Sequence, residues 1–132
     1  MSARRVRTDD HFARLEAIAL ALPEARLVVI EAWDGEPTFR VNDKNFVFAA
    51  KDGTGFSVKL GKEEAAAVVG SDPRCTPTGY GLGRHGWVSV RLEDDASAVD
   101  WTEVAEWVET SYANVAPKRL ARLVLDGGGA AT

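Results

Sequence analysis

The chain of 132 residues lacks several features that would identify a familiar class of protein. It has one cysteine, Cys75, so it cannot form an internal disulfide framework, which suits a reducing compartment. No run approaches the roughly 20 apolar residues of a membrane-spanning helix, which predicts a protein without a membrane partner. The basic start MSARRVR is followed by TDDHFARLEA where a secretory signal would be apolar. We therefore expect a cytoplasmic location.

Side chains that carry out chemistry are also sparse. His11 and His85 are the two histidines, and neither has a second ligand at metal-binding spacing. His11 is interpreted as a solvated residue of a surface helix. Cys75 lacks an adjacent base that would activate it as a nucleophile, although the same loop contains His85. The sequence thus predicts no metal, no cofactor and no catalytic residue, and it favours a non-enzymatic protein over an enzyme.

Charge is distributed unevenly along a chain whose formal net charge is −4. Counting charged residues gives −2 for residues 1–36, +3 for residues 37–92 and −5 for residues 93–132. A strongly basic domain would indicate a nucleic-acid partner, and only the middle segment has that character.

The order of apolar patterns predicts an α+β fold, with an antiparallel sheet packed against N- and C-terminal helices. Helical spacing or composition predicts helices over residues 8–22, 62–70, 100–115 and 118–125. Alternating or β-branched residues predict strands over residues 27–33, 37–41, 45–49, 56–60 and 87–92. The short links NDK and KDGTG favour hairpins. We expect one domain over residues 1–125 and a disordered tail over residues 126–132.

The phase of each pattern predicts which tryptophan is buried. Trp101 shares a helical face with Val104 and Val108, so we expect it in the core. Trp87 shares the strand phase of Ser89 and Arg91, so we expect it to be partly exposed.

The stretch GLGRHGWV, residues 81–88, has the glycine spacing of dinucleotide-binding turns and of kinase glycine loops. A dinucleotide turn must lead into a helix, whose N-terminus holds the pyrophosphate. Here a strand pattern follows, and the other kinase motifs are missing. We interpret these glycines as turn residues with positive φ and predict no nucleotide binding.

Basic residues provide the remaining functional signal. Some occupy outward positions of strands, some occupy hairpin turns, and others lie in the glycine loop or the last helix. A twisted sheet with basic hairpins is able to hold a phosphate backbone, with an aromatic side chain for stacking. The candidate binding residues are Arg40, Lys44, Lys51, Lys59, Arg84, His85, Trp87, Arg91, Lys118 and Arg119.

An ordered set of segments resembles the MmcQ/YjbR family. The segments are GEPTFRV, KNFVFA, FSVKL, GYGLGRHGWVSVRL, DWTEVAEWVETSY and VAPKRLAR, from about Ala13 to Leu125. The resemblance implies a frataxin-like (CyaY-like) sheet and a DNA-binding protein with a double-wing motif. It makes the hairpins around Lys44 and Lys51 the candidate wings.

These observations together predict an MmcQ/YjbR-like domain that binds DNA weakly and largely independently of sequence. The alternative is a non-enzymatic binding module for a small anionic ligand or a protein partner. That module would use the loop before Trp87 and the last helix.

Overall fold

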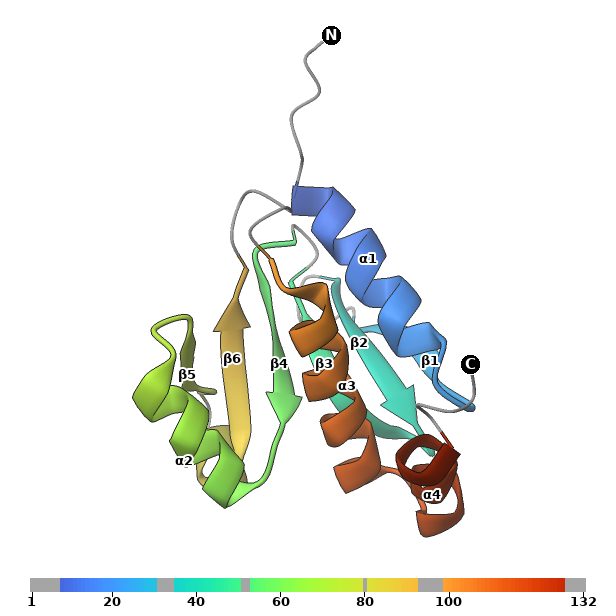
Figure 1. Cartoon of the computed structure of the whole chain (residues 1–132). Coiled ribbons are helices and arrows are strands. Elements are labelled where there is room, and N and C mark those ends of the chain that lie inside the picture. Colours follow the sequence, from blue (N-terminus) through green and yellow to red (C-terminus); the bar gives the residue numbers. More distant parts are fainter. Residues whose placement is uncertain (1–7, 31–34, 51–52, 80, 93–98, 128–132) are drawn as a thin grey trace, which may run out of the picture.

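The computed structural model describes residues 8–30, 35–50, 53–79, 81–92 and 99–127, which adopt the α+β fold predicted from the sequence (Figure 1). Helices cover one face of a six-stranded antiparallel sheet. Among the helices of these residues, none is long and apolar enough to cross a membrane. The predicted tail lies outside the described residues from residue 128 onward.

The sheet has the strand order β1-β2-β3-β4-β6-β5, so its first four strands form the predicted meander. The strands are β1 (Arg26–Ile30), β2 (Glu36–Val41), β3 (Lys44–Ala49), β4 (Gly55–Lys59), β5 (Cys75–Pro77) and β6 (Trp87–Arg91). Sequence patterns missed β5, because three residues ending in proline are too few to show alternation. This short strand forms the sheet edge next to β6.

The described residues also form four α-helices and a short 3-10 helix. They are α1 (Thr8–Leu20), α2 (Lys62–Ser71), η2 (Leu82–His85), α3 (Trp101–Val115) and α4 (Lys118–Gly127). α3 begins where the Asp100 carboxylate accepts a hydrogen bond from the Glu103 backbone N–H at 3.1 Å, which satisfies a free donor of the first turn.

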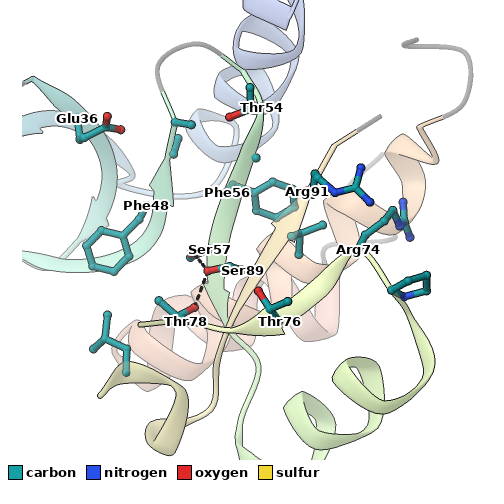
Figure 2. A pocket seen from close by; sticks show the side chains of 16 residues that line it. Glu36, Phe48, Thr54, Phe56, Ser57, Arg74, Thr76, Thr78, Ser89 and Arg91 are labelled. Atoms are coloured by element: carbon teal, nitrogen blue, oxygen red, sulfur yellow. Dashed lines mark hydrogen bonds between the residues drawn. The ribbon is translucent and has the colours of Figure 1, made fainter. Parts of the chain in front are cut away.

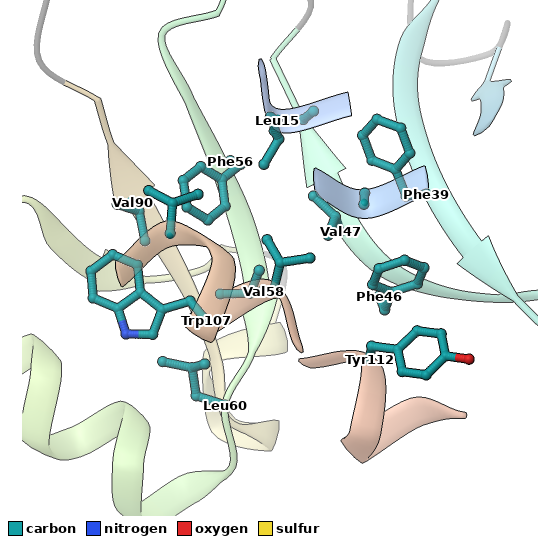
Figure 3. Packing of buried hydrophobic residues seen from close by; sticks show 14 of the residues in the cluster. Leu15, Phe39, Phe46, Val47, Phe56, Val58, Leu60, Val90, Trp107 and Tyr112 are labelled. Carbon is teal, nitrogen blue, oxygen red and sulfur yellow. The ribbon is translucent and has the colours of Figure 1, made fainter. Parts of the chain in front are cut away.

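The core lies between the sheet and helices α1 and α3 (Figure 3). A register shift after Phe39 leaves Phe46 as an extra residue, because Phe39 pairs with Val47 and Arg40 with Asn45. Such a bulge allows two consecutive side chains, Phe46 and Val47, to be fully buried together.

Two buried hydroxyl groups hold α3 against the rest of the molecule. Ser111 Oγ donates to the Phe46 carbonyl at 2.6 Å and accepts from the Lys59 backbone N–H at 2.8 Å. Tyr112 OH donates to the Pro23 carbonyl at 2.7 Å. Because an unpaired buried polar group is costly, these bonds fix how α3 lies on β3 and β4.

Two expectations for the helices were wrong. His11 is buried, with 1% of its surface exposed, and its ring meets the Trp101 ring edge-on at a centroid distance of 5.7 Å. Trp101 is only half-buried, and Trp107 takes the core position. Trp101 is the first residue of α3 and lies at the end of the core. Its ring is covered by two residues of α1, His11 and Arg14, and the guanidinium carbon of Arg14 lies 5.2 Å from the ring centroid.

Candidate functional site

The register of the sheet decides which side chains lie on the face without a described α-helix. Residues that pair directly across antiparallel strands share a face. Pairing connects Thr38 to Phe48, Phe48 to Ser57, Ser57 to Ser89 and Ser89 to Thr76. Alternation then defines this open face as Thr38, Arg40, Phe48, Ser57, Lys59, Thr76, Trp87, Ser89 and Arg91. The opposite, covered face consists of the core residues Phe39, Val47, Phe56, Val58, Val88 and Val90.

A cluster of hydroxyl groups lies at the centre of the open face. Ser89 Oγ is 2.7 Å from Ser57 Oγ and 3.0 Å from Thr78 Oγ1, as the dashed lines in Figure 2 show. The cluster lines a depression of about 1200 Å³, with Arg91 and Glu36 on opposite sides of it. This arrangement offers polar hydrogen-bonding groups inside a shallow and partly apolar surface.

Three of the predicted cations share the open face. These are Arg40, Lys59 and Arg91, and none of them forms an ion pair with another described residue. Arg40 Nε donates a hydrogen bond to Thr38 Oγ1 at 3.4 Å. Arg91 is paired with Gly55, four residues before Lys59 on the same strand. At about 3.3 Å per residue, the two cations are separated by roughly 13 Å along the strand direction. The charges are therefore spread across the sheet, in a way that suits an extended polyanion.

Trp87 lies on the predicted face but is not available for stacking. Only 7% of its surface is exposed, and its ring packs against Phe48 at a centroid distance of 5.0 Å. The strand phase was correct, whereas the expected exposure was wrong, because Phe48 on β3 covers the indole. Alternation in the sequence predicts which face of the sheet a side chain occupies. It does not predict whether a side chain from another strand covers it.

The glycine loop leads into β6, as predicted, and its glycines have structural roles. Gly81 and Gly86 adopt left-handed φ values of 79° and 87°. A Cβ on Gly86 would lie 2.6 Å from the Gly61 backbone, and one on Gly83 would lie 2.9 Å from Pro77. Positive φ and close backbone approach therefore account for the motif. Arg84 and His85, both exposed, lie in η2 within this loop.

The two hairpins that were predicted to carry basic wings lie at opposite ends of β3. The turn at Asn42 and Asp43 has positive φ at both residues, as type I′ hairpins require, and Lys44 follows it. Asp43 is paired with Arg26 at 2.8 Å. Lys51 belongs to the other hairpin and lies outside the described residues.

The cations of the last helix do not join this site. α4 packs against α3 in the helix layer, so Lys118 and Arg119 are separated from the open face by the sheet. Both are exposed, and Arg119 pairs with Glu24 at 3.3 Å.

Arg74 lines the depression, but its guanidinium group is already engaged. It binds both oxygens of Asp72, at 3.0 and 2.7 Å, and Glu103 at 3.1 Å, and it lies 5.8 Å from the Trp107 ring centroid. The hydrogen bonds from Arg74 lower the pKa of Asp72 below its usual value. We infer that Arg74 attaches β5 to α3 and leaves ligand binding to other residues.

The thiol of Cys75 faces the core. Burial, together with the Asp72 charge, raises its pKa to about 11, so the nucleophilic thiolate is scarce at neutral pH. Within the described part of the chain, no group of three or more His, Cys, Asp or Glu residues is placed to hold a metal ion.

Comparison with known proteins identifies the family of this fold. The YjbR family model matches residues 20–114, which include all six strands of the sheet. Lys118 and Arg119 lie beyond the matched segment. A search of curated proteins finds no match. Because the family model covers well over half of the sequence, the chain belongs to the YjbR family.

Proposed function

We propose that the open face binds nucleic acid in the cytoplasm, weakly and with little sequence preference, through contacts with phosphate groups. One observation carries the proposal: the register collects Arg40, Lys59 and Arg91 on one face, free of ion pairs with described residues. A phosphate backbone is a partner that engages several separated cations at once.

The charge of the opposite layer supports this orientation. α3 carries Glu103, Glu106 and Glu109 along its length, and partial burial together with the neighbouring Glu106 raises the pKa of Glu109. These acids belong to the helix layer, while the cations of the open face lie on the other side of the sheet. The acids of α3 therefore lie on the side of the sheet opposite these cations, and repulsion disfavours approach of a polyanion to α3.

The absence of a described α-helix on the open face argues against reading of base sequence. Direct readout generally requires a helix or a projecting β-ribbon in the major groove. The cations of the open face lie on the surface of a sheet, which suits phosphate contacts, and these fix position without sequence information. We expect Kd values of about 10⁻⁴ to 10⁻⁶ M near physiological salt, which are typical of non-specific binding.

Fluorescence anisotropy with labelled single-stranded and duplex DNA over a salt series tests this proposal. Replacing both Lys59 and Arg91 with alanine is expected to reduce the slope of log K against log salt by up to about 1.8, at about 0.9 per lost phosphate contact. The control is the double replacement of Lys118 and Arg122, which removes the same charge from exposed positions of α4. Absence of binding at low salt, or equal effects of the two double variants, would refute the proposal.

A small anionic ligand is the second candidate, favoured by the depression that Arg91 and the hydroxyl cluster line. Such a ligand would raise the melting temperature of the protein by binding only the folded state. Arg91→Ala would abolish that rise, and Lys44→Ala, at the distant hairpin, would preserve it. A panel of small phosphates and carboxylates that leaves the melting temperature unchanged would remove this candidate.

A further inference from the structure

The two edges of the sheet differ in how they are protected against pairing with another strand. β5 is three residues long and ends in Pro77, both of which are common protections of a sheet edge. β1 has five residues, RLVVI, without proline. Its one charged residue, Arg26, is bound to Asp43 at 2.8 Å. Of the two edges, only β1 is suited to accept a further strand.

The backbone of β1 shows which groups face that edge. The carbonyls of Val28 and Ile30 point towards β2, because they accept hydrogen bonds from Thr38 Oγ1 at 2.7 Å and from Gly35 N–H at 3.1 Å. Consecutive residues of an antiparallel strand alternate between the two sides. The N–H and C=O groups of Leu27 and Val29 therefore point to the free edge.

The side chains of the same two residues are exposed. Leu27 is 37% exposed and Val29 is 44% exposed, on the side of the sheet that Phe39 and Pro37 share with them. The exposed large apolar residues of the described chain are Leu20, Leu27, Val29, Leu123 and Leu125. Two of the five thus lie on β1, whose outer edge pairs with no other strand of the described residues.

We propose that a second copy of this chain pairs with β1 in antiparallel orientation, centred on Val28. This register places Leu27 of one copy opposite Val29 of the other, and the symmetry repeats the contact. Each such pair exchanges two backbone hydrogen bonds, because its N–H and C=O groups face the partner. Arg26 then lies opposite Ile30, so like charges do not meet.

The self-complementary sequence is the reason for choosing a second copy over a foreign peptide. The Leu27-Val28-Val29 segment has an aliphatic side chain at each of its three positions. When two copies pair in antiparallel orientation about a two-fold axis, aliphatic side chains therefore lie opposite one another at all three. The two-fold axis is perpendicular to the sheet, so the open faces of both copies lie on the same side. The proposal does not depend on nucleic-acid binding by that face.

The dimer is expected to be weak. Pairing of two five-residue strands covers less surface than the roughly 1,200–2,000 Å² typical of stable complexes. Monomer and dimer should therefore interconvert over the micromolar to millimolar range.

Sedimentation equilibrium over a concentration series tests the proposal. Val29→Lys and Leu27→Glu are each expected to raise the dimer dissociation constant by about tenfold or more, since the dimer contains each altered pair twice. Ala66→Lys is the matched control, because this exposed residue lies on α2, which packs against β5 and β6 at the opposite edge of the sheet, and its replacement should leave association unchanged. Circular dichroism should show all three variants folded.

Mixing the two edge variants tests the register itself. The pairing places the lysine of the Val29→Lys chain opposite the glutamate of the Leu27→Glu chain, so an equimolar mixture should recover association that neither variant shows alone. Three results would overturn the proposal: a wild-type chain that stays monomeric at millimolar concentration, equal weakening by Ala66→Lys, or a mixture that stays monomeric.

Discussion

The covered face and the open face of the sheet are built from alternate residues of the same strands, yet they follow different rules. On β4, Phe56 and Val58 are buried against helices, while Ser57 and Lys59 alternate with them on the open side. The covered face depends on apolar burial, which rises with the area removed from water. The open face depends on hydrogen bonds and on charges that face solvent. We therefore expect its substitutions to alter binding more than folding.

The largest expected effect on stability follows from truncating a buried side chain of the covered face. Phe39→Ala should lower the free energy of unfolding by about 3–5 kcal/mol, because it removes a fully buried ring that also stacks near Phe12. Lys59→Ala is the comparison on the open face, and we expect a change within about 0.5 kcal/mol. Urea unfolding measures both, and similar losses would show that the two faces do not differ as described.

Trp87 is a buried residue of the open face, so its replacement should affect folding. Trp87→Ala should cost close to 3 kcal/mol of unfolding free energy, the lower end of the about 3–5 kcal/mol range for buried aromatic residues. Trp101→Ala should cost less, because Trp101 is only half-buried at the start of α3. The reverse order in thermal or urea unfolding would mean that Phe48 does not shield the indole.

Gly86 tests whether close backbone packing holds the loop at the start of β6. Gly86→Ala should destabilise the fold by about 1–3 kcal/mol, because φ is 87° and an added Cβ would meet Gly61. Gly70→Ala is the control in α2, where an added Cβ has open space and alanine favours a helix by up to about 1 kcal/mol. Equal effects at the two glycines would contradict the packing described here.

Cys75 provides a test in which no loss of stability is expected at neutral pH. A pKa of about 11 against the ordinary 9.0 lowers the thiolate fraction about 100-fold near neutral pH, so iodoacetamide should alkylate the native protein at least that much more slowly than the unfolded chain. Because the folded pKa is raised, the thiol's contribution to stability is present below pH 9 and is lost as the pH rises towards 11. Comparable alkylation rates for the folded and urea-unfolded chains would place the thiol outside the core.

Much of the fold could be predicted from the sequence, because it depends on local patterns of residues. Alternation placed Phe39 and Val41 inside and Arg40 outside, and Asp100 indicated the start of α3. Of the candidate site, the sequence correctly assigned Lys59 and Arg91 to outward positions of their strands. These features depend on residues within a few positions of one another, where spacing alone decides which side chains share a face.

The contacts between distant segments were decided by the tertiary structure. Phe48 buries Trp87, α1 covers Trp101 through His11, and Thr78 completes a hydroxyl cluster with two other segments. The sequence determined which residues alternate and where the chain turns. Only the folded sheet determined that Arg40, Lys59 and Arg91 share one open face while α4 lies on the other side, because strand order and register join segments that are far apart along the chain.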